Sequence, residues 1–142
     1  MQLTWRDELG KKTLTQKLRM QPGQQVLIMN PPAGYADRLD PLPEGIDLHK
    51  DKAGKYDFVH LFAESVAELE RDGPVALDSI TYDGLLWISY PKGSSKIKTD
   101  ISRDVGWDLV ASAGLRPVTQ ISIDETWSAL RFRPIELVGK SR

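Results

Sequence analysis

Three short apolar runs dominate the hydrophobic pattern of the chain. They occupy Gln25–Met29, Tyr56–Phe62 and 85–90, and in each run apolar side chains stand at consecutive rather than alternate positions. Continuous runs of this length are typical of parallel strands that are covered on both faces. Because Gly23 precedes the first run and Pro91 follows the third, we expect three central strands bounded by these residues.

Weaker patterns fill the spaces between the runs. Helical spacing of apolar residues predicts a short helix over 13–20 and another over 65–71, which Gly73-Pro74 is expected to interrupt before a second short helical stretch. The segment 33–39 has room for barely two helical turns, and 46–49 has the pattern of a short strand.

A longer helix is predicted over 103–113. Ser102 is suited to the N-cap, because its hydroxyl can accept a hydrogen bond from the first turn, and Gly114 stands where a residue just past the helix end belongs.

The C-terminal part of the chain alternates apolar and polar residues over 118–123 and 127–132. Only three residues separate these segments, so we expect a β-hairpin. The whole order predicts an α/β, three-layer, Rossmann-like fold, with a mostly parallel sheet and an antiparallel C-terminal hairpin strand.

Several segments of this frame resemble known families. The segments PGQQVL (22–27), YDFV (56–59) and DGLLWI (83–88), together with the closing hairpin, are similar to the frame of Rossmann-like methyltransferases. The segments LWISYPKGSS (86–95), TDISRDV (99–105) and IDETWSALRF (123–132) resemble a family of small bacterial proteins classed as a domain of unknown function. Both resemblances imply a shortened Rossmann-like core, and the second implies no activity.

The resemblance to methyltransferases also implies a cofactor turn after the first strand, with an acidic residue before a Gly-x-Gly-x-Gly spacing. Ile28 stands at the acidic position, and only Gly34 matches a glycine, the third. Asn30 and Pro32 stand at the other two glycine positions, where a side chain obstructs close approach and proline lacks an amide donor. We therefore expect no S-adenosylmethionine and no other cofactor, and we interpret the Pro-Pro turn as a rigid exit from the strand.

Composition limits the classes of protein to which this chain can belong. The 142 residues suit one domain over 1–142, in which 1–12 form an N-terminal extension and 139–142 a frayed tail. A net charge of −1 offers no field for nucleic acid or an anionic membrane, and the absence of cysteine excludes disulfides and thiolate chemistry. We expect a cytoplasmic protein that binds neither nucleic acid nor a membrane and that can form a homo-oligomer.

The two histidines offer little catalytic chemistry. Asp47, His49 and Asp51 alternate and would share one face of a strand, so they can be arranged as metal ligands, but a solvated polar face gives the same pattern. His60 lies inside an apolar strand, where we expect a hydrogen-bonded core histidine rather than a general base.

Strand direction predicts where a site would lie. Ligands of open parallel sheets bind outside the carboxyl ends of the strands, and three loops are expected to meet at that edge. The candidate residues in these loops are Asn30, Gly34, Tyr35, Lys92, Ser94, Ser95, Lys96, Asp124, Glu125 and Trp127.

Two interpretations of these candidates stay open. Lys92 and Lys96 can hold an anion, or they can form a solvated basic loop that is salt-bridged to Asp124 and Glu125. Asp124 can supply an acid or base beside Trp127, or it can bond its own backbone in a turn while Trp127 packs.

The sequence favours a binding or regulatory module of Rossmann-like fold that is not a methyltransferase. Its partner would be a small anion or another protein. The alternative is an enzyme or a nucleotide or anion binder that uses the carboxyl edge of the sheet.

Overall fold

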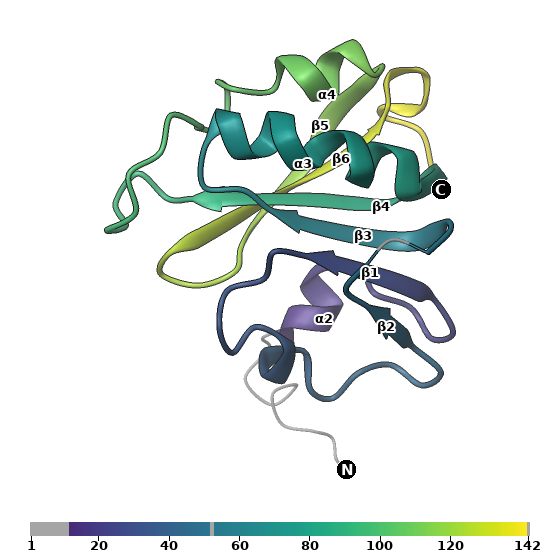
Figure 1. The fold of residues 1–142 in the computed structure, drawn as a ribbon. Helices are drawn as coiled ribbons and strands as arrows, with labels where there is room; N and C mark the ends of the chain where they lie inside the picture. The colour runs from purple at the N-terminus through teal and green to yellow at the C-terminus, as the bar shows by residue number, and fades with distance from the viewer. Residues whose placement is uncertain (1–11, 52, 142) are drawn as a thin grey trace.

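The computed structural model describes residues 12–51 and 53–141, and in this part of the chain one six-stranded sheet forms the centre of the molecule (Figure 1). The spatial order of its strands is β2-β1-β3-β4-β6-β5. The strands are β1 (Gln25–Met29), β2 (Asp47–His49), β3 (Tyr56–Phe62), β4 (Ile80–Pro91), β5 (Leu115–Ser122) and β6 (Trp127–Pro134).

Four neighbouring strands, β2, β1, β3 and β4, are parallel, whereas β6 is antiparallel to both β4 and β5. Strand β5 therefore runs in the same direction as β4. This is the expected mostly parallel sheet with one antiparallel hairpin strand, and it confirms the Rossmann-like α/β fold.

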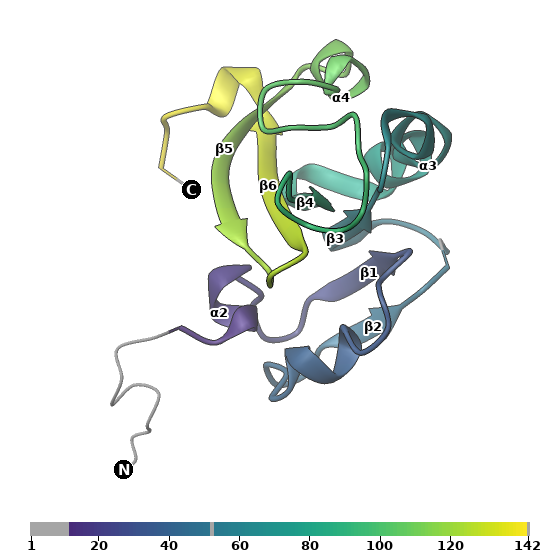
Figure 2. The ribbon, with the colours of Figure 1, turned by 90° about the vertical axis from the view of Figure 1, so that its left-hand side faces the viewer.

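Helices cover both faces of the sheet (Figures 1 and 2). The helices α3 (Val66–Ser79) and α4 (Asp108–Ser112) lie on one face. On the other face lie α2 (Leu14–Lys17) and the 3-10 helix η1 (Ala36–Leu39), and a second 3-10 turn, η2 (Ile135–Leu137), follows β6. The short α2 is held by a capping box, in which the Thr13 and Gln16 side chains accept from each other's backbone amides.

The sheet has a buried core on each side, which explains the continuous apolar runs. In β3, Val59 and Leu61 pack into the core beneath α3, and Phe58 and Phe62 pack into the core on the side of α2. All four are at most 2% exposed. A strand with both faces buried needs apolar residues at successive positions.

The helix α3 corrects one expectation, because it continues through Gly73-Pro74 to Ser79. Proline inside a helix removes one hydrogen bond at a cost of about 3 kcal/mol. Packing favours the continuous helix: Leu69, Gly73 and Ala76 are buried, and a Cβ at Gly73 would lie 2.6 Å from a methyl of Leu109. The absent side chain at Gly73 therefore lets α4 pack directly against α3.

The helix predicted over 103–113 is also wrong in its first half. Ser102 is not its N-cap but part of a turn that returns to Val105, and the helix begins only at Asp108. The indole nitrogen of Trp107 donates to the carbonyl oxygens of Ser102 and Arg103, at 2.8 and 3.1 Å. Burial of Trp107 thus engages carbonyls that a helix would have used for its own first turn.

The predicted hairpin is present between β5 and β6. Its turn lies beside α2 (Figure 2), where the Lys17 ammonium donates to the Ser122 carbonyl oxygen at 3.2 Å. Most of the proposed N-terminal extension and the last residue of the proposed tail lie outside the described residues.

Candidate functional site

The carboxyl ends of β1, β3, β4 and β5 lie at one edge of the sheet. The loop after β4 and the turn after β5 adjoin there, because the Lys92 amide donates to the Thr126 carbonyl oxygen at 2.7 Å. The topology therefore brings the basic loop and the acidic turn together, as strand direction requires.

A side-chain hydrogen bond ties the turn after β1 to α3. Asn30 has a left-handed backbone (φ 57°). Its side-chain amide nitrogen, Nδ2, donates to a carboxylate oxygen of Asp72 in α3 at 2.8 Å. Gly34 also has a positive φ, of 82°, and the following residue, Tyr35, turns its side chain into the core, where it is 1% exposed.

Tyr35 begins a buried chain of hydrogen bonds that runs to β3 and then to β4. Its hydroxyl lies 2.6 Å from Nδ1 of His60, whose Nε2 lies 2.6 Å from the hydroxyl of Ser89. The rings of Tyr35 and His60 also contact each other edge to face. His60 is fully buried, which confirms the prediction of a hydrogen-bonded core histidine.

Burial sets the protonation of both rings. Desolvation lowers the pKa of His60 to about 3, so that a neutral imidazole donates from one nitrogen and accepts at the other. Desolvation raises the pKa of Tyr35 far above its ordinary value, and the nearby Arg38 charge offsets only part of this rise. Both rings are therefore uncharged near neutral pH, and the chain supplies buried hydrogen bonds to the core.

The turn after β1 departs from the glycine-rich cofactor turn that the resemblance to methyltransferases implies. Pro31 and Pro32 offer no amide donors, and the Tyr35 ring fills the space beneath the turn. The cavity that remains between this turn, η1 and the end of β2 measures about 90 Å³. Sites for cofactor-sized ligands measure roughly 300 to 1,000 Å³.

The hairpin turn is built around Asp124. One carboxylate oxygen accepts from the amides of Thr126 and Trp127, each at 2.8 Å, so Asp124 bonds its own backbone. Trp127 is 5% exposed and its ring packs edge to face against Phe62. Of the two interpretations of this segment, the structure shows the turn with a packed tryptophan.

A cation that the sequence analysis did not single out, Arg38, also contacts this turn. Arg38 of η1 forms an ion pair with the second oxygen of Asp124 at 3.1 Å and donates to the Ile123 carbonyl oxygen at 2.7 Å. Within the described residues no ion pair joins Lys92 or Lys96 to Asp124. The expected salt bridge from these lysines to Asp124 is therefore wrong, and Arg38 is the partner of this carboxylate. No local signal pointed to Arg38, because 86 positions separate it from Asp124.

The other loop candidates are less engaged. Ser95 bonds the backbone of Ile97 within its own loop, at 3.3 and 3.4 Å. Ser94, Lys96 and Glu125 are exposed.

An open cleft of about 400 Å³ lies between the β4–α4 loop and the hairpin. It is lined by Tyr90, Lys92, Gly93, Thr99, Ile101, Ser102, Arg103, Gln120 and Ser128. Among these lining residues there are two cations and no carboxylate. A neighbouring hollow of about 370 Å³ shares Arg103 and Gln120 and carries one carboxylate, Asp104.

Hydrogen bonds position the cleft's polar groups. The Lys92 ammonium donates to the Ser122 hydroxyl at 2.7 Å, and the Gln120 amide donates to the Tyr90 hydroxyl at 3.0 Å. Burial raises the pKa of Tyr90, the Ser128 hydrogen bond and the Arg103 charge offset this in part, and the Asp104 charge adds to the rise. In the described part of the chain no hydrogen bond or ion pair engages the Arg103 guanidinium.

The proposed metal ligands do not assemble. Among residues 12–51 and 53–141 no group of three potential metal ligands lies together. His49 instead contacts Asp47 at 3.2 Å and the Gln25 side chain at 3.1 Å. None of the described helices has the length and apolar character needed to cross a membrane.

Comparison with known proteins defines the fold and not the activity. No family model and no curated protein matches the chain. Similar solved structures include a methyltransferase from Aquifex aeolicus described as S-adenosylmethionine-dependent (TM-score 0.52, 10% identity, 89% of this chain and 95% of that chain). They also include the fibrillarin pre-rRNA processing protein of Methanococcus jannaschii (TM-score 0.51, 11% identity, 80% and 68% of the two chains).

A third similar structure is a protein of Bordetella parapertussis described as a "possible exported protein" (TM-score 0.54, 11% identity, 91% and 68% of the two chains). At these identities the likeness establishes a methyltransferase-type Rossmann-like fold alone. The resemblance to a family of small bacterial proteins stays a prediction.

Proposed function

We propose that this domain is a binding module for small anions that does not use S-adenosylmethionine. The observation that carries the proposal is the cleft of about 400 Å³ at the carboxyl edge, whose lining residues include Lys92, Arg103 and hydroxyl and amide groups and contain no carboxylate. The ligand class is a small molecule that carries a phosphate or a carboxylate.

The chemistry of the cleft supports an anion. Arginine presents a planar set of donors that matches phosphate and carboxylate oxygens, and lysine adds a point charge. The Arg103 guanidinium has no carboxylate partner among the described residues, so an incoming anion does not have to displace one. Thr99 and Ser128 add hydroxyl groups to the same lining.

The volumes of the hollows beside β4 and β1 also favour a ligand site beside β4 rather than beside β1. About 400 Å³ beside β4 is within the range of small-molecule sites, whereas about 90 Å³ beside β1 is not. In this proposal the domain keeps the methyltransferase-type fold, but its ligand site lies beside β4. The turn that would hold the cofactor in a methyltransferase follows β1, farther along the same edge of the sheet.

Calorimetric titration of the full chain with pyrophosphate tests the proposal. We expect saturable binding that Arg103→Gln or Lys92→Gln weakens about tenfold or more, because a charge-assisted hydrogen bond contributes about 1.5 to 3 kcal/mol. Lys96→Gln is the matched control, since Lys96 is an exposed cation of the same loop that does not line the cleft.

Two results would count against the proposal. One is the absence of saturable binding at millimolar pyrophosphate. The other is an equal loss in Lys96→Gln, which would show diffuse attraction to a basic loop rather than a site.

A further inference from the structure

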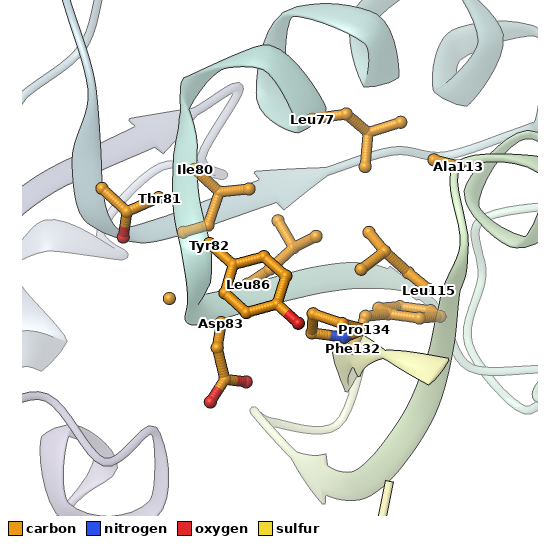
Figure 3. A pocket seen from close by; sticks show the side chains of 11 residues that line it. Leu77, Ile80, Thr81, Tyr82, Asp83, Leu86, Ala113, Leu115, Phe132 and Pro134 are labelled. Carbon is orange, nitrogen blue, oxygen red and sulfur yellow. The ribbon is translucent and has the colours of Figure 1, made fainter. Parts of the chain in front are cut away.

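Another cavity lies near the opposite end of β4, away from the carboxyl edge, and most of its lining is apolar. It measures about 190 Å³ and lies between α3, the start of β4 and the β5–β6 hairpin (Figure 3). Its apolar walls are formed by Leu77, Ile80, Leu86, Leu115, Phe132 and Pro134.

An irregularity in β4 shapes the mouth of this cavity. Where β3 advances from Tyr56 to Phe58, its partner in β4 advances from Ile80 to Leu85, so the intervening residues of β4 bulge out of the ladder. Bulges of this kind occur preferentially beside functional sites, where they redirect side chains. Here the bulge carries Tyr82, which is 70% exposed, to the rim of the cavity.

The bulge is a built feature with a conformational cost. Asp83 has a positive φ of 56°, and a Cβ at Gly84 would lie 2.7 Å from the Thr81 hydroxyl and 2.8 Å from a methyl of Ile80. A side chain at position 84 would therefore require Thr81 or Ile80 to move, and a left-handed Asp is strained relative to an ordinary strand residue.

Two side-chain contacts hold the rim in place. Both carboxylate oxygens of Asp83 accept from the Arg133 guanidinium, at 2.9 and 3.1 Å. The Tyr82 hydroxyl donates to a carboxylate oxygen of Glu136 at 2.7 Å. The rim therefore carries two carboxylates and one guanidinium, and this excess of negative charge disfavours an anionic occupant.

We infer that this cavity is a binding site for a small uncharged molecule with one aromatic ring. The volume suits such an occupant, because an apolar cavity of about 150 Å³ in a protein interior holds benzene. The Phe132 and Tyr82 rings can contact an aromatic guest from the wall and from the rim, and Figure 3 shows both side chains at the cavity. The site is independent of the anion cleft.

Titration of the ¹³C-methyl-labelled full chain with p-cresol, followed by NMR, tests the inference. We expect saturable shifts of the Leu77, Ile80 and Leu115 methyl signals and nuclear Overhauser contacts from these methyls to the cresol ring. The anionic analogue p-toluate should bind at least tenfold more weakly.

A plugging variant supplies the specific control. Ala113 lines the cavity and is exposed, so Ala113→Phe can occupy the space without entering the core, and it should weaken p-cresol at least tenfold. Ala67→Phe places the same ring at an exposed position of α3 outside the cavity and should leave binding unchanged.

Three results would overturn the inference. These are shifts that do not saturate, contacts from p-cresol to methyls elsewhere in the protein, and unchanged affinity in Ala113→Phe. Equal affinity for p-toluate would overturn the assignment to uncharged ligands. Because pyrophosphate and p-cresol are titrated separately, failure here leaves the test of the anion cleft unaffected.

Discussion

His60 should make the fold sensitive to mild acid. Burial lowers its pKa to about 3 in the folded chain, whereas an unfolded chain exposes an imidazole with an ordinary pKa of 6.5. Below pH 6.5 the unfolded state therefore binds a proton that the folded state does not. The contribution of His60 to the free energy of unfolding is therefore retained above pH 6.5 and is lost progressively as the pH falls towards 3.

The size of the loss follows from these two values. At pH 5 the unfolded imidazole is protonated in a ratio of about thirty to one, which favours unfolding by about 2 kcal/mol relative to pH 8. Any folded pKa below about 4 gives the same loss at pH 5, so the magnitude depends on burial of a neutral ring and little else. A domain of ordinary stability retains only about 5 to 15 kcal/mol, so this loss is readily measured.

Urea unfolding of the wild type and of His60→Gln at pH 8 and pH 5 measures the effect. Glutamine can donate and accept as the neutral imidazole does, but it does not titrate. We expect the wild type to lose about 2 kcal/mol more than His60→Gln between the two pH values. The chain has only one other histidine, and His49→Gln is the matched control because it removes that imidazole and leaves His60 in place.

An equal pH dependence in the wild type and His60→Gln would refute the reasoning. It would mean that the imidazole is protonated or solvated in the folded state, and that the buried chain from Tyr35 to Ser89 is not formed as described.

Three further outcomes follow from the described contacts. Gly114→Val should lower the free energy of unfolding, measured in urea, by about 1 to 2 kcal/mol. The cost is conformational, because φ is 83° at this position and no atom obstructs the added Cβ. Gly114→Asn should lower the free energy of unfolding less, because asparagine tolerates a positive φ better than valine does. Arg38→Ala should lose under about 1 kcal/mol, since the ion pair is exposed, whereas Asp124→Ala should lose more because two amides also lose their acceptor. Equal losses for the last two variants would show that the turn does not depend on Asp124. S-adenosylmethionine at millimolar concentration should leave the thermal midpoint unchanged, and a clear rise would show that the β1 turn admits it.

The sequence predicted the central strands because their signal is local, although β4 begins at Ile80, five residues before the predicted strand over 85–90. A strand such as β3, with both faces buried, must be apolar at successive positions, and no distant residue is needed to recognise it. The two helix errors have the opposite origin. Continuity of α3 through Pro74 depends on the approach of Leu109, and the late start of α4 depends on where the Trp107 indole packs.

The candidate site was predicted in outline and missed in detail for the same reason. Strand direction alone placed the β4 loop beside the hairpin turn. Arg38 and Arg103 were not candidates, because one lies on the distant η1 and the other was assigned to a helix that begins five residues later. Tyr35 was a candidate for the edge, yet its partner His60 draws it into the core.

Amide NMR of one labelled sample titrated first with pyrophosphate and then with S-adenosylmethionine tests the central claim most directly. The account predicts that pyrophosphate shifts the amide signals of Lys92, Thr99 and Arg103 in a saturable way, and that S-adenosylmethionine shifts none of the signals in the turn after β1. Saturable shifts at Asn30 and Gly34 with S-adenosylmethionine, together with no response of the cleft to pyrophosphate, would contradict it.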